Sequence, residues 1–147
     1  MKRIILLFAL LSISFSLMGR SDKPVRVGVD ATVDCFDSSV RWMVPSYGIG
    51  VRARLGRTDQ WFNLVGGLRY IYGTRLSGPQ IPVMLNVNTI RGKKRSFYLG
   101  CGYEFDFLGT YWGCAKFQAG LAGKNLDFRV FYKPYQGDLG FGVSWYF

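Results

Sequence analysis

The sequence predicts an all-β fold, an eight-stranded antiparallel up-and-down transmembrane β-barrel. Three observations predict it. Eight short runs alternate between apolar and polar residues and are separated by turn residues. The polar positions of these runs are rich in glycine, and aromatic residues gather near the ends of the apolar positions. Runs of about 8–12 residues also match the length at which a tilted strand crosses a bilayer.

The first residues are expected to act as an export signal rather than to fold. Lys2 and Arg3 form a short basic segment, and residues 4–11 form an apolar run directly after it. This order is typical of a secretory signal peptide, and the run is too short for a convincing membrane-spanning helix. We therefore assign residues 1–19 to a signal peptide and residues 22–147 to one barrel domain.

Each predicted strand carries its apolar residues on one face, because successive side chains of a strand point to opposite sides. The last run shows this most clearly, with Phe141, Val143, Trp145 and Phe147 on one face and glycine, serine and tyrosine on the other. The expected strands are residues 25–33, 47–55, 62–72, 81–89, 97–107, 111–121, 126–133 and 140–147.

The segments between the strands are short, and an even number of antiparallel strands places both termini at one end of the barrel. If that end faces the periplasm, the outer loops are residues 34–46, 74–80, 108–110 and 134–138. The periplasmic turns are then residues 56–60, 90–96 and 122–125.

Alternation alone does not say which face is inside, since a soluble lipocalin-like barrel has the same period with its faces exchanged. The glycine-rich polar face indicates the lumen, because eight strands leave an interior only wide enough for side chains to fill. Aromatic residues near strand ends indicate the girdles at the two membrane interfaces. The membrane barrel is therefore our leading interpretation, and a secreted lipocalin-like barrel that carries an apolar ligand is the alternative.

The polar face also carries charges of both signs, and charges removed from water must be paired. Glu104 and Asp106 are the expected centre of a salt-bridge network that plugs the lumen as a structural element rather than an ion pathway. The predicted network consists of Arg52, Arg54, Arg69, Glu104, Asp106 and Arg129. The same face holds Arg26, Lys116, Lys133, Asp30 and Asp127.

The three cysteines are not expected to form a disulfide within the chain. Cys101 falls on the lipid face and Cys114 on the lumen face, so their side chains point apart. Cys35 falls near the start of the first outer loop. Because the number of cysteines is odd, a disulfide between two molecules stays open.

The composition argues against an enzyme. The chain has no histidine, which excludes a Ser-His-Asp type of site. No catalytic, cofactor-binding or metal-binding residue is expected, and no cofactor. Without Lys2 and Arg3 the chain keeps seventeen basic against nine acidic residues. For an exported protein this excess favours anionic lipid and lipopolysaccharide as neighbours, not nucleic acid.

Three stretches resemble the small outer-membrane β-barrel families of Gram-negative cell envelopes. The architecture is similar to the eight-stranded OmpA/OmpX type. The stretches "IPVMLNV" and "SFYLGCGYEF" resemble PorT-like "outer membrane protein beta-barrel" domains, and "VSWYF" is similar to the C-terminal signal of such porin-like barrels.

The resemblance implies a location in the cell outer membrane. It also implies that Val143, Trp145 and Phe147 form an assembly signal read by the barrel-assembly machinery. We therefore expect a non-catalytic integral outer-membrane protein with a structural or interaction role in the envelope, whose specific protein partner the sequence does not identify.

Overall fold

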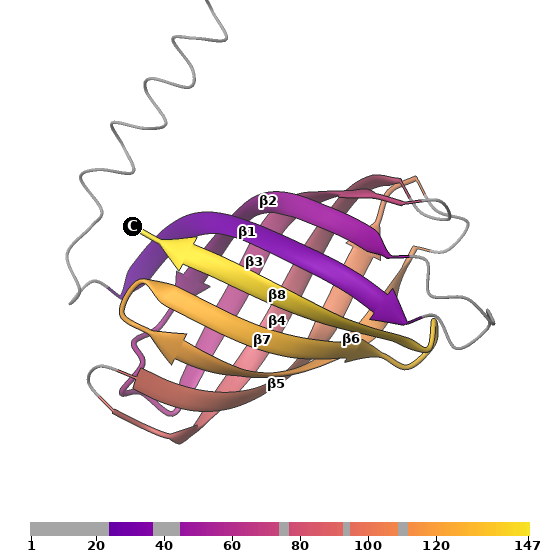
Figure 1. Ribbon diagram of the computed structural model, residues 1–147. Helices are drawn as coiled ribbons and strands as arrows, with labels where there is room; N and C mark the ends of the chain where they lie inside the picture. Colours follow the sequence, from indigo (N-terminus) through magenta and orange to yellow (C-terminus); the bar gives the residue numbers. More distant parts are fainter. Residues whose placement is uncertain (1–23, 37–44, 74–76, 93–94, 109–111) are drawn as a thin grey trace, which may run out of the picture.

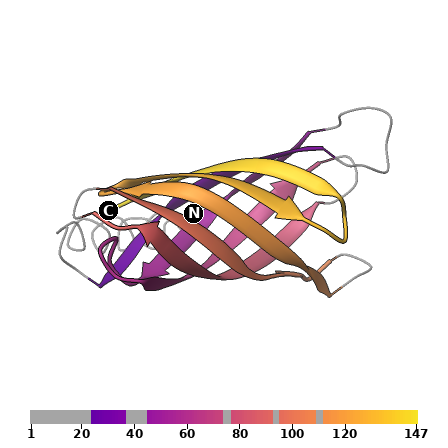
Figure 2. The ribbon, with the colours of Figure 1, turned by 90° about the horizontal axis from the view of Figure 1, so that it is seen from below.

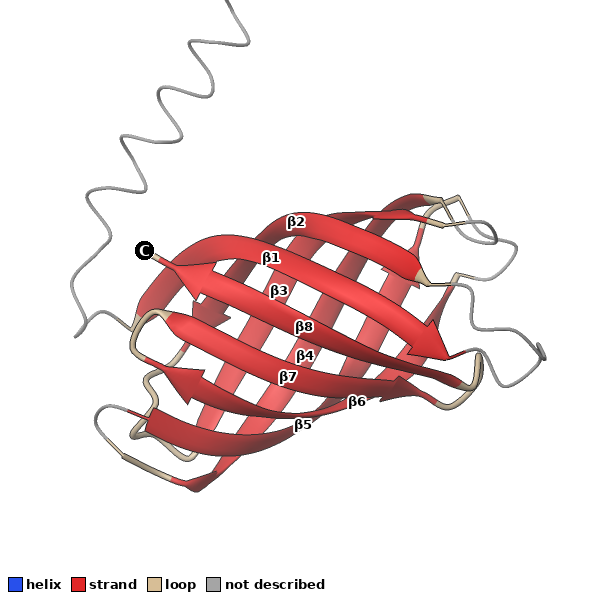
Figure 3. Ribbon diagram, in the orientation of Figure 1, coloured by secondary structure: helices blue, strands red, loops and turns tan. Residues whose placement is uncertain are grey.

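The computed structural model describes residues 24–36, 45–73, 77–92, 95–108 and 112–147. The predicted signal peptide, residues 1–19, lies outside the described residues. The fold is all-β, and Figure 3 shows strands joined by loops at both ends of the molecule. The strands are β1 Val25–Phe36, β2 Ser46–Leu55, β3 Phe62–Tyr72, β4 Gly78–Ile90, β5 Arg95–Asp106, β6 Gly113–Gly123, β7 Leu126–Lys133 and β8 Asp138–Tyr146.

The strands form a closed antiparallel barrel in which each strand pairs with its neighbours in sequence. The last strand closes the barrel by pairing with the first, from Gly28 opposite Tyr146 to Val33 opposite Phe141. Figure 1 shows β8 in yellow lying against β1 in indigo, with the C-terminus beside the start of β1. In the view from below, the strands cross the barrel obliquely (Figure 2). The predicted fold class is confirmed.

Six of the eight strands differ from the predicted bounds by one to three residues at one or both ends, and two of these differences change the place of a lumen residue. β1 continues to Phe36, so Asp34 belongs to a strand and not to the first outer loop. The register against β8 shifts between Asp34 and Phe36, which marks a bulge that the alternating pattern does not reveal. β4 begins at Gly78 rather than at residue 81. Glycine and Pro79 read as a turn, yet proline is tolerated near the first residues of a strand.

A third boundary lies in the least regular of the predicted strands. β6 begins at Gly113, which has a positive φ of 139°, rather than at residue 111. Trp112 precedes the strand and is 91% exposed. A glycine is required at the first position of β6 because L-residues with a side chain rarely adopt this backbone conformation.

The two faces of the wall have opposite chemistry. Side chains that point into the barrel are buried and mostly polar, and those that point outward are apolar and exposed. On β2, for example, Arg52 and Arg54 point inward while Ile49 and Val51 point outward. The predicted faces are therefore confirmed for the described strands.

Glycine makes room for the large side chains in the lumen. Gly142 lies opposite Arg129, Gly140 opposite Phe131, and Gly120 opposite Tyr98 on the neighbouring strands. A Cβ on Gly142 would lie 2.6 Å from Cζ of Arg129, and one on Gly120 would lie 2.5 Å from the Tyr98 hydroxyl oxygen. The lumen is thus filled by side chains that depend on glycine across from them.

Candidate functional site

The lumen holds the polar groups that could serve a function, and they form three clusters along the barrel. We name each cluster after its central carboxylate: the Glu104 cluster, the Asp30 cluster and the Asp127 cluster. Every strand supplies inward side chains because polar residues recur at every second position.

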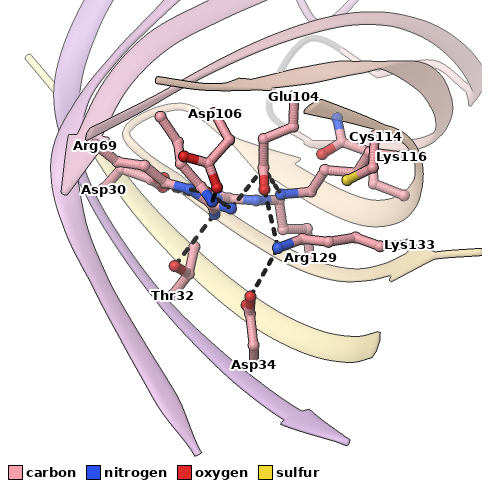
Figure 4. Close-up of polar contacts among 12 residues, drawn as sticks. Asp30, Thr32, Asp34, Arg69, Glu104, Asp106, Cys114, Lys116, Arg129 and Lys133 are labelled. Atoms are coloured by element: carbon pink, nitrogen blue, oxygen red, sulfur yellow. Dashed lines mark hydrogen bonds and ion pairs between the residues drawn. The ribbon is translucent and has the colours of Figure 1, made fainter. Parts of the chain in front are cut away.

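Glu104 on β5 lies at the centre of the first cluster, surrounded by cations from three other strands (Figure 4). Its Oε2 accepts hydrogen bonds from Arg69 Nη2 at 2.5 Å and Lys116 Nζ at 2.8 Å. Its Oε1 forms an ion pair with Lys133 Nζ at 2.9 Å. Lys133 also donates to Asp34 Oδ2 at 2.8 Å, so the cluster spans β1, β3, β5, β6 and β7.

An aromatic ring completes the Glu104 cluster. Phe131 points inward from β7 and is 1% exposed. The Lys116 ammonium lies 3.8 Å from the centre of the ring, and Lys133 and Arg69 lie within 5.8 Å of it. Cations over an aromatic face are attracted by its quadrupole, and more strongly where water is excluded. The ring therefore helps to hold cations that share a single carboxylate.

Asp106 occupies the edge of the Glu104 cluster rather than its centre. Arg69 donates to Gln80 Oε1 at 3.0 Å and to Thr32 Oγ1 at 3.2 Å. Gln80 Nε2 in turn donates to Asp106 Oδ2 at 3.4 Å. Asp106 is only half-buried, and it also accepts a hydrogen bond from the Leu108 backbone N–H. The two predicted central carboxylates thus have different surroundings, because Asp106 comes last in β5 and lies near the mouth.

The Asp30 cluster connects the strands on both sides of the closing strand. Arg129 Nη2 on β7 lies 2.7 Å from both carboxylate oxygens of Asp30 on β1. Ser144 on β8 lies between them, donating to Asp30 Oδ1 at 2.7 Å and accepting from Arg129 Nη1 at 2.7 Å. Arg52 Nη1 approaches Asp30 Oδ1 at 3.9 Å. This buried, charge-assisted set fixes the seam at which β8 meets β1.

The Asp127 cluster lies nearest to the turns. Tyr98 donates to Asp127 Oδ1 at 2.7 Å, and Arg54 Nη1 lies 4.0 Å from Asp127 Oδ2. Arg54 is 1% exposed, and its guanidinium stacks over the Tyr146 ring at 4.8 Å. Arg26, further along the same end, donates to the Lys124 carbonyl oxygen.

Side-chain amides link the clusters to the turn end along β3, β4 and β6. Asn86 Nδ2 donates to Asn63 Oδ1 at 2.9 Å, and Gln118 Nε2 donates to Asn86 Oδ1 at 2.6 Å. Asn63 Nδ2 donates to Asn88 Oδ1 at 3.2 Å, and Asn88 Nδ2 donates to the Gln60 carbonyl oxygen at 2.6 Å. These neutral groups fill the lumen without adding charge.

The predicted network residues are therefore divided among clusters. Glu104 and Arg69 belong to the first, Arg52 and Arg129 to the second, and Arg54 to the third. Sequence reasoning did not assign roles to Asp34, Gln80, Ser144 or Phe131. Parity within the strands would have found Ser144 and Phe131, whereas Asp34 and Gln80 were hidden by the boundary errors.

The predicted assembly-signal residues lie on and just after β8. Val143 and Trp145 are exposed on the outer face. Phe147 follows the strand, and its backbone N–H donates to the Val27 carbonyl oxygen at 3.0 Å.

The cysteines follow the predicted parity where the structure describes them. Cys101 is exposed on the outer face, Cys114 is buried in the lumen, and both are free thiols. The predicted positions of these two cysteines on opposite faces of the wall are confirmed. The side chain of Cys35 lies outside the described residues.

No three carboxylate or thiol side chains among the described residues form a group that could hold a metal ion. No helix in the described ranges is long and apolar enough to cross a bilayer.

The chain was compared with known proteins by family, by sequence and by structure. No protein-family model matches it, and no curated protein matches its sequence. It is similar in structure to a solved chain described as "De novo design of transmembrane beta-barrels", with a TM-score of 0.56 and 16% sequence identity. The match covers 86% of this chain and 98% of the designed one. The likeness shows the fold that the two share: a closed antiparallel barrel of the kind found in transmembrane β-barrels.

Proposed function

We propose that this protein is an integral outer-membrane β-barrel with a structural or interaction role in the cell envelope. It is non-catalytic, and its lumen is plugged by the charged network. One observation carries the proposal: apolar side chains face outward on every strand, while charged and amide side chains fill the interior. A soluble barrel has the opposite arrangement.

The outward apolar surface continues around the whole barrel. One outward residue near the middle of each strand illustrates it, and these side chains are between 41% and 72% exposed. They are Val29, Ile49, Leu68, Leu85, Leu99, Phe117, Val130 and Phe141. Soluble monomers rarely expose contiguous apolar patches above a few hundred Å². Lipid is therefore the environment that fits this surface.

Aromatic residues at both ends of the barrel support the same placement. At the loop end the exposed rings are Tyr47, Tyr72, Phe107, Trp112 and Tyr135, and at the turn end they are Trp61, Phe62 and Trp145. Aromatic side chains favour the boundary between headgroups and hydrocarbon, where they form two girdles.

The interior argues against the soluble alternative. A carrier of an apolar ligand needs a lumen lined by apolar side chains. Here the described lumen contains the Glu104, Asp30 and Asp127 clusters together with the amides. A charged lining would bind an apolar ligand poorly, because the ligand would displace hydrogen bonds and ion pairs.

The outer membrane as the location is a proposal from the sequence. The predicted signal peptide over residues 1–19 and the OmpA/OmpX and PorT-like resemblance support it. In this proposal the barrel-assembly machinery reads Val143, Trp145 and Phe147, and the barrel then contacts phospholipid and lipopolysaccharide. No specific protein partner is assigned.

Extraction of membranes tests the proposal. We expect the mature protein to stay in the membrane pellet after alkaline carbonate, to require detergent for solubility, and to migrate faster on gels before boiling than after. Full solubility in detergent-free buffer, with one mobility on gels, would contradict it. In planar bilayers the plugged lumen should give no conductance steps.

A further inference from the structure

Within the described part of the chain, exposed cations gather at the turn end of the barrel. At the turn end, Arg91, Arg95 and Lys124 are exposed, and none of them forms an ion pair within the described part of the chain. At the loop end, the lysines that the structure describes, Lys116 and Lys133, are buried in the lumen. We call Arg91, Arg95 and Lys124 the basic collar.

The collar residues lie on neighbouring turns. Arg95, at the start of β5, pairs with Gly123, which directly precedes Lys124 in the β6–β7 turn. Gly92 packs against the Arg95 backbone, since a Cβ on Gly92 would lie 2.7 Å from the Arg95 carbonyl oxygen. This contact brings the residue after Arg91 to the same place. The three cations therefore belong to one side of the turn end.

A fourth exposed cation at this end, Arg57, is already neutralised, which makes it a natural control. Arg57 forms two hydrogen bonds with Asp59, at 3.0 and 2.9 Å, in a bidentate pair. The collar cations have no such carboxylate partner among the described residues.

Arg91 is held at the level where an aromatic girdle would lie. Its guanidinium stacks over the Trp61 ring with 3.7 Å between Cζ and the ring centre. Trp61 is 57% exposed, and the apolar side chains of Ile90 and Leu121 beside the collar are 69% and 58% exposed. Stacking leaves the N–H groups of the guanidinium edge directed away from the ring, where an anion could accept from them.

We infer that the basic collar, with Trp61 as the platform for Arg91, is a binding site for the phosphate headgroup of an anionic phospholipid. The cations complement the phosphate, while Ile90 and Leu121 lie where acyl chains would run. This inference rests on the proposed function, because only a membrane-embedded barrel presents its collar to headgroups. It adds a preferred lipid and an end of the barrel at which that lipid binds.

Native mass spectrometry of the detergent-purified mature protein, incubated with equal amounts of phosphatidylglycerol and phosphatidylcholine, tests the inference. We expect single-lipid adducts to favour phosphatidylglycerol by about fivefold or more, since one basic residue near an anionic surface contributes about 1 kcal/mol. The triple variant Arg91→Gln, Arg95→Gln, Lys124→Gln should bring the ratio to about one. The control double variant Arg57→Gln, Asp59→Asn removes a neutral ion pair at the same end and should leave the ratio at the wild-type value.

Two checks keep the outcome decisive. Each variant must show the heat-modifiable mobility of a folded barrel. If the triple variant does not, the single substitutions Arg91→Gln and Trp61→Leu replace it. Each of these is expected to lower the ratio of phosphatidylglycerol to phosphatidylcholine adducts. Inorganic phosphate at the ionic strength of the chloride control should not displace the lipid. Equal adducts in the wild type, or displacement by phosphate, would overturn the inference. A protein soluble without detergent would instead overturn the proposed function.

Discussion

Replacing Glu104 by glutamine should destabilise the barrel more than any other single neutralisation in the lumen. The side chain keeps its size but loses the charge that Arg69, Lys116 and Lys133 share. Lys133 retains Asp34, at 2.8 Å, and Arg69 retains Gln80 and Thr32. Lys116 has no second carboxylate within the described lumen. Removing one partner of a buried ion pair costs about 3–5 kcal/mol because the other charge stays uncompensated. We expect Glu104→Gln to lower the free energy of unfolding by that amount.

The assay is equilibrium urea unfolding of the barrel in phosphatidylcholine vesicles, followed by tryptophan fluorescence. Asp106→Asn is the matched control, and it should cost less than about 1 kcal/mol because Asp106 is half-buried at the edge of the cluster. Adding Lys116→Met to Glu104→Gln should restore about 1–3 kcal/mol, the usual coupling between contacting residues. A loss below about 0.5 kcal/mol for Glu104→Gln, or one equal to that of Asp106→Asn, would refute a network centred on Glu104.

Three further predictions concern the wall of the barrel. Val143→Arg, on the outer face, should cost about 2–4 kcal/mol in vesicles or block insertion, while Val143→Thr inserts normally; equal stabilities would contradict the face assignment. Gly142→Ala should lower the urea-unfolding free energy by about 1–3 kcal/mol, because the new Cβ would lie 2.6 Å from Arg129 Cζ. Gly66→Ala should leave the unfolding free energy unchanged, because the atom nearest to the new Cβ would be 3.9 Å away. A larger loss of stability for Gly66→Ala than for Gly142→Ala would contradict the packing argument. Phe147→Ala should slow assembly in cells, measured as unfolded protein in pulse-labelled envelopes, and leave refolding in detergent unchanged; a defect in both would identify a structural role instead.

The period of the sequence predicted the strands and the face that each side chain takes. β3 and β7 have the predicted bounds, because outward apolar residues continue to both ends of each strand and turn residues follow them. The predicted strand bounds were wrong where a proline or a register shift lies within a strand. Pro79 lies inside β4, opposite Tyr70 on β3, and the shift after Asp34 interrupts the pairing of β1.

The pairing of charges inside the barrel was much less predictable. Alternation places Asp30, Glu104 and Arg129 in the lumen, but it does not predict which carboxylate forms an ion pair with which cation. Asp30 pairs with Ser144 where β8 meets β1, and Arg129 pairs with Gly142, two residues earlier on β8, from where its side chain reaches both Ser144 and Asp30. Glu104 reaches Lys133 across the lumen, which depends on the stagger of the strands around the whole circumference.

The central claim is that the outer face of the barrel lies in hydrocarbon, and Trp145 tests it most directly. This residue is 50% exposed on the outer face of β8. In a variant that keeps Trp145 as its only tryptophan, refolded in vesicles, lipids brominated on their acyl chains should quench its fluorescence strongly, and aqueous acrylamide should quench it weakly. Strong quenching by acrylamide with none from the brominated lipids would contradict the account.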